Sequence, residues 1–503
     1  MATRWETFPI KLEGGLVTDL GRLEQGFQMP GSATILQNFE PAVEGGYTKV
    51  LGYEKFSETE VTGTGTVFGV VAVDNEVCLA LREGKWYHST GTTWTEKATL
   101  ANPSVTRIRA ERYNFDGTAK VVITDGVNNP VRYDSAAATM TYFTAPPAEV
   151  TGAFDVKNFK NHLFFAKGST LTFAAPYSDE DFAAANGAGS INVGDSITGL
   201  FVFRDQLFVF SLNSIRRLVG NTLDDFQLLS VTQNTGCICG HTIQEVGGDI
   251  MYLGPDGIRY LSASERENDF GLARASARIQ KQVLAAINSN CFYSSLTIAS
   301  KNQYRLFTYV ATVPKTNAEG FLATKYSNQT AEDISWANLR GFKVYSASKY
   351  QNRDREVILF SSDTGFVYRM NTSNSFDGED IEAIFETPYM PIRDPKVRKT
   401  VYKHTLYAKP NGPMDLSVTI KWDYAQSDAS QPSSFTISGG AGVAVYGTSV
   451  YGTDVYGVQA EENFYNNAMG SGFVVAVNYY DKSTNPPYNL NFTTLELREN
   501  EKR

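Results

Sequence analysis

Short strands separated by tight turns recur along most of this chain, and this repetition limits the folds that the chain can adopt. Each unit reads as an apolar strand, a polar turn, a second apolar strand, another turn and an amphipathic strand. Asp-Gly pairs such as Asp116-Gly117 and Asp125-Gly126 occupy several turns, and they suit tight hairpins because they accept positive φ angles. The units lie at residues 66–91, 111–134, 156–177, 197–220, 242–263 and 356–371.

The spacing of these units favours a β-propeller. Self-similar antiparallel units at intervals of roughly 40–50 residues are typical of propeller blades, each of which is a small sheet beside a central channel. Aromatic residues make up 13% of the chain and glycine occurs 42 times, which favours strands and turns over helices. We therefore predict an all-β fold with a β-propeller of about six blades, five or seven being possible. A pair of β-sandwiches is the alternative.

One segment interrupts the strand pattern. Residues 273–289 place Ile279, Val283 and Ile287 on one face at helical spacing, with Leu284 beside them. We expect one helix that braces the edge of a sheet. A helix that binds a partner is the alternative interpretation.

The pattern changes after about residue 376, which predicts a second domain. The segment 376–503 reads as a β-sandwich-like C-terminal domain, with a Ser/Gly-rich stretch inside it that we expect to form a mobile insertion at 427–468. The propeller is expected at 61–375. Residues 1–60 are expected to be an extended N-terminal segment that leads into it.

The insertion contains a tyrosine repeat. Tyr446, Tyr451 and Tyr456 recur every five residues in "VYGTSVYGTDVYG", and odd spacing sends successive side chains to opposite faces of a strand. Tyrosine is common at interfaces because it is apolar with a polar tip. These three residues are our candidates for subunit contacts or for the lining of a channel. Packing on their own domain is the alternative.

The charge and the cysteine content exclude several classes of protein. The net charge is −9 and the pI is about 5.2, so the chain lacks the basic character of a protein that grips nucleic acid, although DNA could pass through a channel without binding. Four cysteines form no disulfide framework. We see no secretory signal and no apolar run long enough for a membrane anchor. These features predict a protein made in a reducing cytoplasm.

Few residues suggest chemistry. Cys237, Cys239 and His241 in "CICGH" could offer three zinc ligands, but a structural zinc site commonly has four, and no second cluster is visible. Buried cysteines that pack in a blade are the favoured interpretation. There is no G-x-S-x-G nucleophile motif and no phosphate-binding loop. We predict no enzyme activity, no metal and no cofactor.

A partial match to the Asp-box of sialidases supports the same view. Ser361, Asp363 and Gly365 follow its S-x-D-x-G spacing, but the aromatic position that should follow is different. The Asp-box is a hairpin that stabilises the fold, so this match predicts a blade turn rather than an active site.

The stretch "LQNFEPAVEGGYTKVLGYEKF" at 36–56 resembles a signature near the start of the tail nozzle proteins of short-tailed bacteriophages, the tail tubular protein B and packaged-DNA stabilisation protein family. Many relatives have Arg-Pro-Gly where this chain has Val50-Leu51-Gly52. The segments 115–134, 246–262 and 377–399 are similar to further pieces of that family, in the same order. The signature residues are Asn38, Pro41, Gly45, Gly46, Lys49, Gly52 and Tyr53.

This resemblance implies a structural component of a phage tail, which would reside in the virion and in the host cytoplasm before assembly. Such proteins form a homo-oligomeric ring, typically a hexamer, that extends and closes the DNA channel. They dock on the head–tail adaptor protein below the portal and adjoin a tail fibre or tail needle protein. Double-stranded DNA passes through without specific binding, and the genome is retained until infection.

Two other functions are open on the sequence. The first is a carbohydrate-binding or depolymerising receptor-binding propeller, which would need exposed aromatic residues and paired carboxylates. The second is a propeller scaffold of a host cell, which would be a stable monomer.

Overall fold

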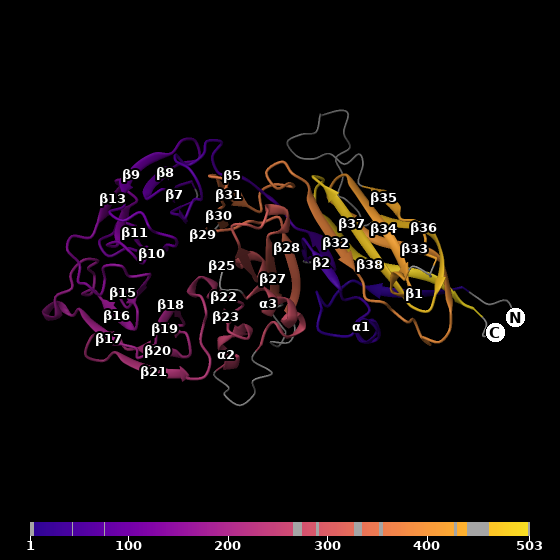
Figure 1. Cartoon of the computed structure of the whole chain (residues 1–503), viewed down its shortest axis with the longest axis horizontal. Coiled ribbons are helices and arrows are strands. Elements are labelled where there is room, and N and C mark those ends of the chain that lie inside the picture. Colours follow the sequence, from indigo (N-terminus) through magenta and orange to yellow (C-terminus); the bar gives the residue numbers. More distant parts are fainter. Residues whose placement is uncertain are drawn as a thin grey trace.

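The computed structural model has two parts, a ring of small sheets and a packed pair of larger sheets beside it (Figure 1). The all-β prediction is confirmed, with a β-propeller joined to a β-sandwich. The structure describes residues 5–42, 44–74, 76–264, 274–287, 291–325, 334–351, 356–426, 430–439 and 462–500.

Six separate antiparallel sheets form blades of the propeller, in agreement with the prediction of about six. The first three are β6 (Gly69–Ala72), β7 (Cys78–Arg82), β8 (Lys85–Ser89) and β9 (Thr95–Thr99); β10 (Arg109–Tyr113), β11 (Lys120–Thr124), β12 (Val131–Asp134) and β13 (Thr139–Tyr142); and β14 (Asp155–Phe159), β15 (His162–Lys167), β16 (Thr170–Phe173) and β17 (Gly189–Asn192). The next three are β18 (Ile197–Phe203), β19 (Gln206–Ser211), β20 (Ile215–Val219) and β21 (Gln227–Thr232); β22 (Gln244–Val246), β23 (Asp249–Gly254) and β24 (Gly257–Tyr260); and β29 (Ser346–Gln351), β30 (Glu356–Ser361), β31 (Val367–Met370) and β5 (Tyr53–Lys55).

A further sector of the ring stands between the fifth and sixth blades. Its strands are β25 (Phe292–Ile298), β26 (Gln303–Tyr309), β27 (Glu319–Lys325) and β28 (Ile334–Arg340). Strand β25 contacts β22 on one side and β29 on the other, so this sector completes the ring. Unlike the six blades, it is not a separate sheet, because β28 pairs with β2 (Ile35–Gln37) and the sheet continues into the sandwich.

The blade turns follow from local chemistry. Gly117 and Gly126 have φ angles of +87° and +78°, a region where glycine carries no steric penalty. The Asp125 carboxylate accepts hydrogen bonds from the next backbone amides along the turn. The Asp-box-like segment also forms a hairpin turn, since Ser361 ends β30 and Gly365 precedes β31, as predicted.

The second part is a sandwich of two sheets, in agreement with the prediction. One sheet contains β3 (Phe39–Pro41), β4 (Tyr47–Lys49), β38 (Tyr488–Glu499), β33 (Lys399–Pro410) and β36 (Glu462–Gly472), with β1 (Glu6–Lys11) also paired to β38. The other contains β32 (Ile381–Glu386), β37 (Val475–Ser483), β34 (Met414–Trp422) and β35 (Phe435–Gly439), and it is continuous through β2 with the propeller sector. The N-terminal strands therefore pair largely with the C-terminal ones. The predicted boundaries at 60 and 375 stay a prediction.

The bracing helix is present but shorter than the sequence pattern suggests. A 3₁₀ turn η3 (Ala277–Ile279) leads into α3 (Gln280–Ala286), and Ile279 and Val283 are buried while Leu284 is exposed. Two further α-helices were not predicted, α1 (Arg22–Gln28) and α2 (Leu261–Ser264). The remaining 3₁₀ turns are η1 (Ala184–Asn186), η2 (Gly240–Thr242), η4 (Ala299–Lys301), η5 (Lys315–Asn317) and η6 (Asp423–Ala425).

A histidine is buried between the two sheets of the sandwich. The Nε2 atom of His404 lies 2.9 Å from the Tyr479 hydroxyl and 2.9 Å from the Thr493 hydroxyl. Burial lowers the pKa of His404 from 6.5 to about 4. The unfolded chain therefore binds a proton that the folded chain does not bind between these two pH values, and the stability falls as the pH is lowered through this window.

We predict that the His404→Gln variant loses less stability on acidification than the wild type. Between pH 7 and pH 4.5, the free energy of unfolding of the wild type should fall by about 2–3 kcal/mol more than that of the variant. Urea unfolding at the two pH values measures this difference. Equal losses in the two proteins would show that His404 is protonated when folded.

Candidate functional site: the junction between propeller and sandwich

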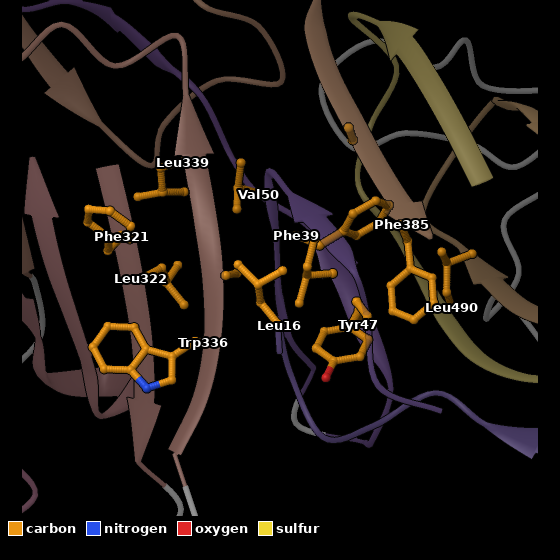
Figure 2. Packing of buried hydrophobic residues seen from close by; sticks show 14 of the residues in the cluster. Leu16, Phe39, Tyr47, Val50, Phe321, Leu322, Trp336, Leu339, Phe385 and Leu490 are labelled. Carbon is orange, nitrogen blue, oxygen red and sulfur yellow. The ribbon is translucent and has the colours of Figure 1, made fainter. Parts of the chain in front are cut away.

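The N-terminal stretch at residues 36–56 lies between the two parts of the molecule. Figure 2 shows Phe39, Tyr47 and Val50 of this stretch between propeller side chains such as Trp336 and sandwich side chains such as Phe385. All five are at most 1% exposed and belong to one hydrophobic cluster. Burial of such large side chains contributes roughly 1.5–3 kcal/mol each, so this core holds the two parts together.

Asn38 connects a propeller strand to a sandwich strand. Its side-chain amide donates to the carbonyls of Arg340 at 3.1 Å and Glu382 at 2.8 Å, and its side-chain oxygen accepts from the Arg340 amide at 2.9 Å. Its φ angle is +54°, a conformation that Asn tolerates better than most residues. A residue here must supply donors, an acceptor and a left-handed backbone, which explains the choice of Asn.

Glu40 and Arg305 form a buried ion pair across the junction. Glu40 lies on β3 of the sandwich and Arg305 on β26 of the propeller, and they are 2% and 0% exposed. A carboxylate oxygen of Glu40 is 3.1 Å from Nη2 of Arg305, and Lys301 approaches the other oxygen at 2.5 Å. Gln303 donates to the same carboxylate, and the Asn371 side chain accepts from Arg305.

These contacts determine the charge states of Glu40 and Arg305. Burial alone would raise the pKa of Glu40, but Arg305 and Lys301 outweigh it and hold the pKa below its ordinary value. Burial lowers the pKa of Arg305, and Glu40 opposes that shift. Both groups therefore stay charged at neutral pH, and each depends on the other because an unpaired buried charge is strongly unfavourable.

Lys49 anchors the next part of the stretch. Its ammonium group lies 2.8 Å from Asp481 on β37, both side chains are 1% exposed, and it also donates to the carbonyl and hydroxyl of Ser483. Burial lowers the pKa of Lys49, and Asp481 opposes the shift. This second buried pair fixes β4 to the opposite sheet of the sandwich.

Close backbone contacts explain the glycines. A Cβ atom on Gly46 would lie 2.1 Å from the Leu490 carbonyl oxygen, and one on Gly52 would lie 2.0 Å from that of Ser375. Gly45 has a φ of +94° in the turn between β3 and β4, where its amide donates to the Ala42 carbonyl. These glycines are required by the backbone path of the stretch.

Tyr53 completes the junction in the sixth blade. Its ring packs at 5.0–5.6 Å from those of Phe342, Phe360, Tyr368 and Phe376, and its hydroxyl donates to the Gly341 carbonyl. Strand β5, which begins at Tyr53, pairs with β31 and closes that blade with N-terminal chain. The stretch thus pairs first with the sandwich and then with the propeller.

The other candidate residues lie elsewhere. Cys237 is buried in a blade core, as favoured, and burial raises the pKa of its thiol to about 12. Cys239 and His241 are half-buried and line a cavity. Among the residues that the structure describes, no three His, Cys, Asp or Glu side chains are placed to hold a metal ion.

The tyrosine repeat stays untested. Tyr446, Tyr451 and Tyr456 lie outside the described residues. In the described ranges, none of the helices is long and apolar enough to span a bilayer.

Sequence reasoning missed both buried ion pairs. Glu40 and Lys49 lie in the quoted stretch, but their partners Arg305 and Asp481 are more than 250 residues away in the chain. The available signal is a single charged residue inside an otherwise uncharged strand, as at Arg305 in "QYRLFTY". That signal identifies a candidate for a buried charge but not its partner.

Comparisons with known proteins add no function. No protein-family model matches the chain, and no curated protein matches it. One similar solved structure is the extracellular domain of a one-component system of B. thetaiotaomicron, with 12% identity over 70% of this chain and 43% of that one and a TM-score of 0.40. A second is YCF48 bound to a D1 peptide, with 10% identity over 62% of this chain and 96% of that one and a TM-score of 0.38. A third is the Mitotic Checkpoint Complex, with 9% identity over 64% of this chain and 92% of that one and a TM-score of 0.42. The chain spans less than half of the first of these proteins.

We predict that the Glu40→Gln variant is about 3–5 kcal/mol less stable than the wild type, because Arg305 loses its buried counter-charge. The double variant with Arg305→Met should recover most of this loss, since neither charge is then left unpaired. Guanidinium chloride unfolding of the four proteins of the cycle measures both effects. The control is Glu319→Gln, which breaks an exposed pair with Arg340 and should cost less than about 1 kcal/mol.

We also predict that Gly52→Ala costs about 3 kcal/mol or more, because the added methyl group meets the Ser375 backbone, which cannot rotate away. The control is Gly21→Ala, where the nearest atoms lie 3.9 Å from the new methyl group, with an expected cost below about 1 kcal/mol. Thermal unfolding compares the two variants. Equal effects would contradict the close approach at Gly52.

Proposed function

We propose that this protein is a structural subunit of the tail of a short-tailed bacteriophage, a nozzle that forms a ring below the portal and adaptor. One observation carries the proposal. The residues that resemble the nozzle signature, Asn38 to Tyr53, are those that join the propeller to the sandwich. Residues that hold two domains together, rather than bind a ligand, are suited to a structural subunit.

The junction supports this function because it makes the two parts resist separation. The nine-stranded sheet runs from β25 in the ring to β35 in the sandwich through β2. Pulling the parts apart would break this sheet and expose Glu40 and Arg305 without their partners. Separating the parts is therefore unfavourable for two reasons: it breaks the buried pair of Glu40 and Arg305, and it exposes a large apolar core to water. The wall of a pressurised DNA channel needs a subunit that does not flex at its domain boundary.

The charge supports the same function. At a net charge of −9 the chain repels DNA on average, and a channel built from such subunits would let DNA slide without adhesion, because each phosphate contact would otherwise slow it. The ring would be a homo-oligomer of about six copies that releases the genome on infection. Its partners would be the adaptor and a tail fibre or tail needle protein.

Exposed aromatic residues on the sandwich offer contact surface for such a ring. Trp5 and Tyr402 pack with their ring centroids 5.0 Å apart and their planes tilted by 38°, and each is 42% exposed. Tyr465 is 72% exposed, with Lys403 above its ring. Aromatic side chains of this kind are enriched at protein interfaces.

We predict that the purified protein forms rings when it is mixed with an adaptor–portal complex from a short-tailed phage, or alone at high concentration. Each subunit interface should bury more than about 2,000 Å², as in obligate assemblies. Negative-stain electron microscopy together with light scattering measures ring formation and copy number. Rings of about six copies with a central hole are the expected result.

The matched variant replaces Tyr446, Tyr451 and Tyr456 together with Ser. Loss of rings with an unchanged thermal unfolding profile would assign the repeat to subunit contacts. Wild-type protein that stays monomeric with every adaptor–portal complex, and that binds glycans on an array, would contradict the nozzle function and favour the receptor-binding propeller.

A further inference from the structure

A cavity of about 380 Å³ lies among residues of the propeller ring. It lies where the segment before β10, the segment before β22 and the start of β25 meet. Arg107, Cys239, His241 and Cys291 supply its polar groups. Cavities of this size hold small ligands in other proteins.

Arg107 is the charged group of this cavity, and its hydrogen bonds are incomplete. Its Nη2 atom donates to the Tyr293 carbonyl, and its guanidinium group lies 5.6 Å from the Phe292 ring centroid and 5.7 Å from that of Tyr345. The Nη1 atom is buried and has no hydrogen-bond partner among the described residues. A buried donor of a charged group that lacks a partner is costly, and such an atom calls for an explanation.

The charge of Arg107 is not balanced by the residues around it. None of the side chains that line the cavity, within the part of the chain that the structure describes, is a carboxylate. The neighbouring Arg109 is different, because it lies 3.5 Å from Asp155 and donates to the Gly240 carbonyl. Burial, together with Arg107 and Arg109, lowers the pKa of His241 well below its ordinary value, so this imidazole is neutral at pH 7. The cavity therefore carries a net positive charge.

We propose that this cavity binds a small carboxylate whose charge pairs with Arg107. A guanidinium group matches the geometry of a carboxylate. The described residues that line the cavity include no lysine, and a single unpartnered guanidinium nitrogen suits a monoanion better than a phosphate dianion. Ile238, Ile287 and Phe292 supply apolar lining for the body of the ligand. The carboxylate could belong to a free organic acid or to an acidic side chain of a partner peptide.

The test uses two probes of nearly equal shape, phenylacetate and its uncharged amide, phenylacetamide. The readout is the rate at which iodoacetamide alkylates Cys239 and Cys291, measured by peptide mass spectrometry on the full chain. A bound ligand should shield these two thiols. Phenylacetate at about ten times its Kd should slow alkylation about tenfold, because only the free protein reacts. Cys78 and Cys237 are buried and serve as unreactive internal controls.

A peptide arm identifies the source of the carboxylate. The capped dipeptide acetyl-Phe-Asp-amide is compared with acetyl-Phe-Asn-amide. Protection by either charged probe, without protection by its uncharged partner, supports the proposal. Protection only by the Asp dipeptide would assign the site to a partner peptide. Equal effects of charged and uncharged probes, or no effect of any probe, would overturn it.

The variant Arg107→Gln should lose the protection by phenylacetate. Its matched control is Arg112→Gln, since Arg112 also lies above an aromatic ring, that of Tyr350 at 4.9 Å, but does not line this cavity. Retained protection in Arg107→Gln would overturn the proposal. If Arg107→Gln fails to fold, the comparison of charged and uncharged probes on the wild-type chain still decides the question.

Discussion

The buried contact between Glu40 and Arg305 is the interaction on which the arrangement of the two parts depends. One charge comes from a strand of the sandwich and the other from a strand of the propeller, and neither is stable in the interior without its partner. The pair therefore penalises every arrangement in which the two parts are displaced. Hydrophobic burial around Phe39 and Trp336 supplies attraction between the parts, while the ion pair and Asn38 fix the register.

This arrangement explains why the N-terminal stretch contains so many backbone constraints. The chain must leave the sandwich, pass between the two parts and enter the last blade within about 20 residues. It can do so only with turns and close approaches, as at Gly46 and Gly52, where the neighbouring backbone leaves no room for a side chain. The proposed function in a tail ring rests on this stiffness, since a subunit with a fixed domain angle suits a closed ring.

Features set by local chemistry could be predicted from the sequence. The six recognised units correspond to the six separate blades, because short polar turns and apolar strands are set by the sequence over a few residues. The sector 292–340 was missed, because its sheet is continuous with the sandwich and its connections differ from the short turns of the recognised units. A 3₁₀ turn (Ala299–Lys301) links β25 to β26, and residues 310–318 link β26 to β27. Helix α1 was missed because Gly26 lowers its helix propensity, yet a Cβ atom there would lie 2.1 Å from the Tyr389 carbonyl oxygen. The partners of Glu40 and Lys49 could not be predicted, because nothing local in a strand identifies a residue hundreds of positions away.

The central claim is that the propeller and the sandwich form one cooperative unit through the stretch that contains Asn38 and Glu40. Differential scanning calorimetry of the wild-type chain tests this claim most directly. The account predicts a single unfolding transition whose calorimetric enthalpy equals its van't Hoff enthalpy. Two separate transitions, or a calorimetric enthalpy about twice the van't Hoff value, would show that the two parts unfold independently and would contradict the account.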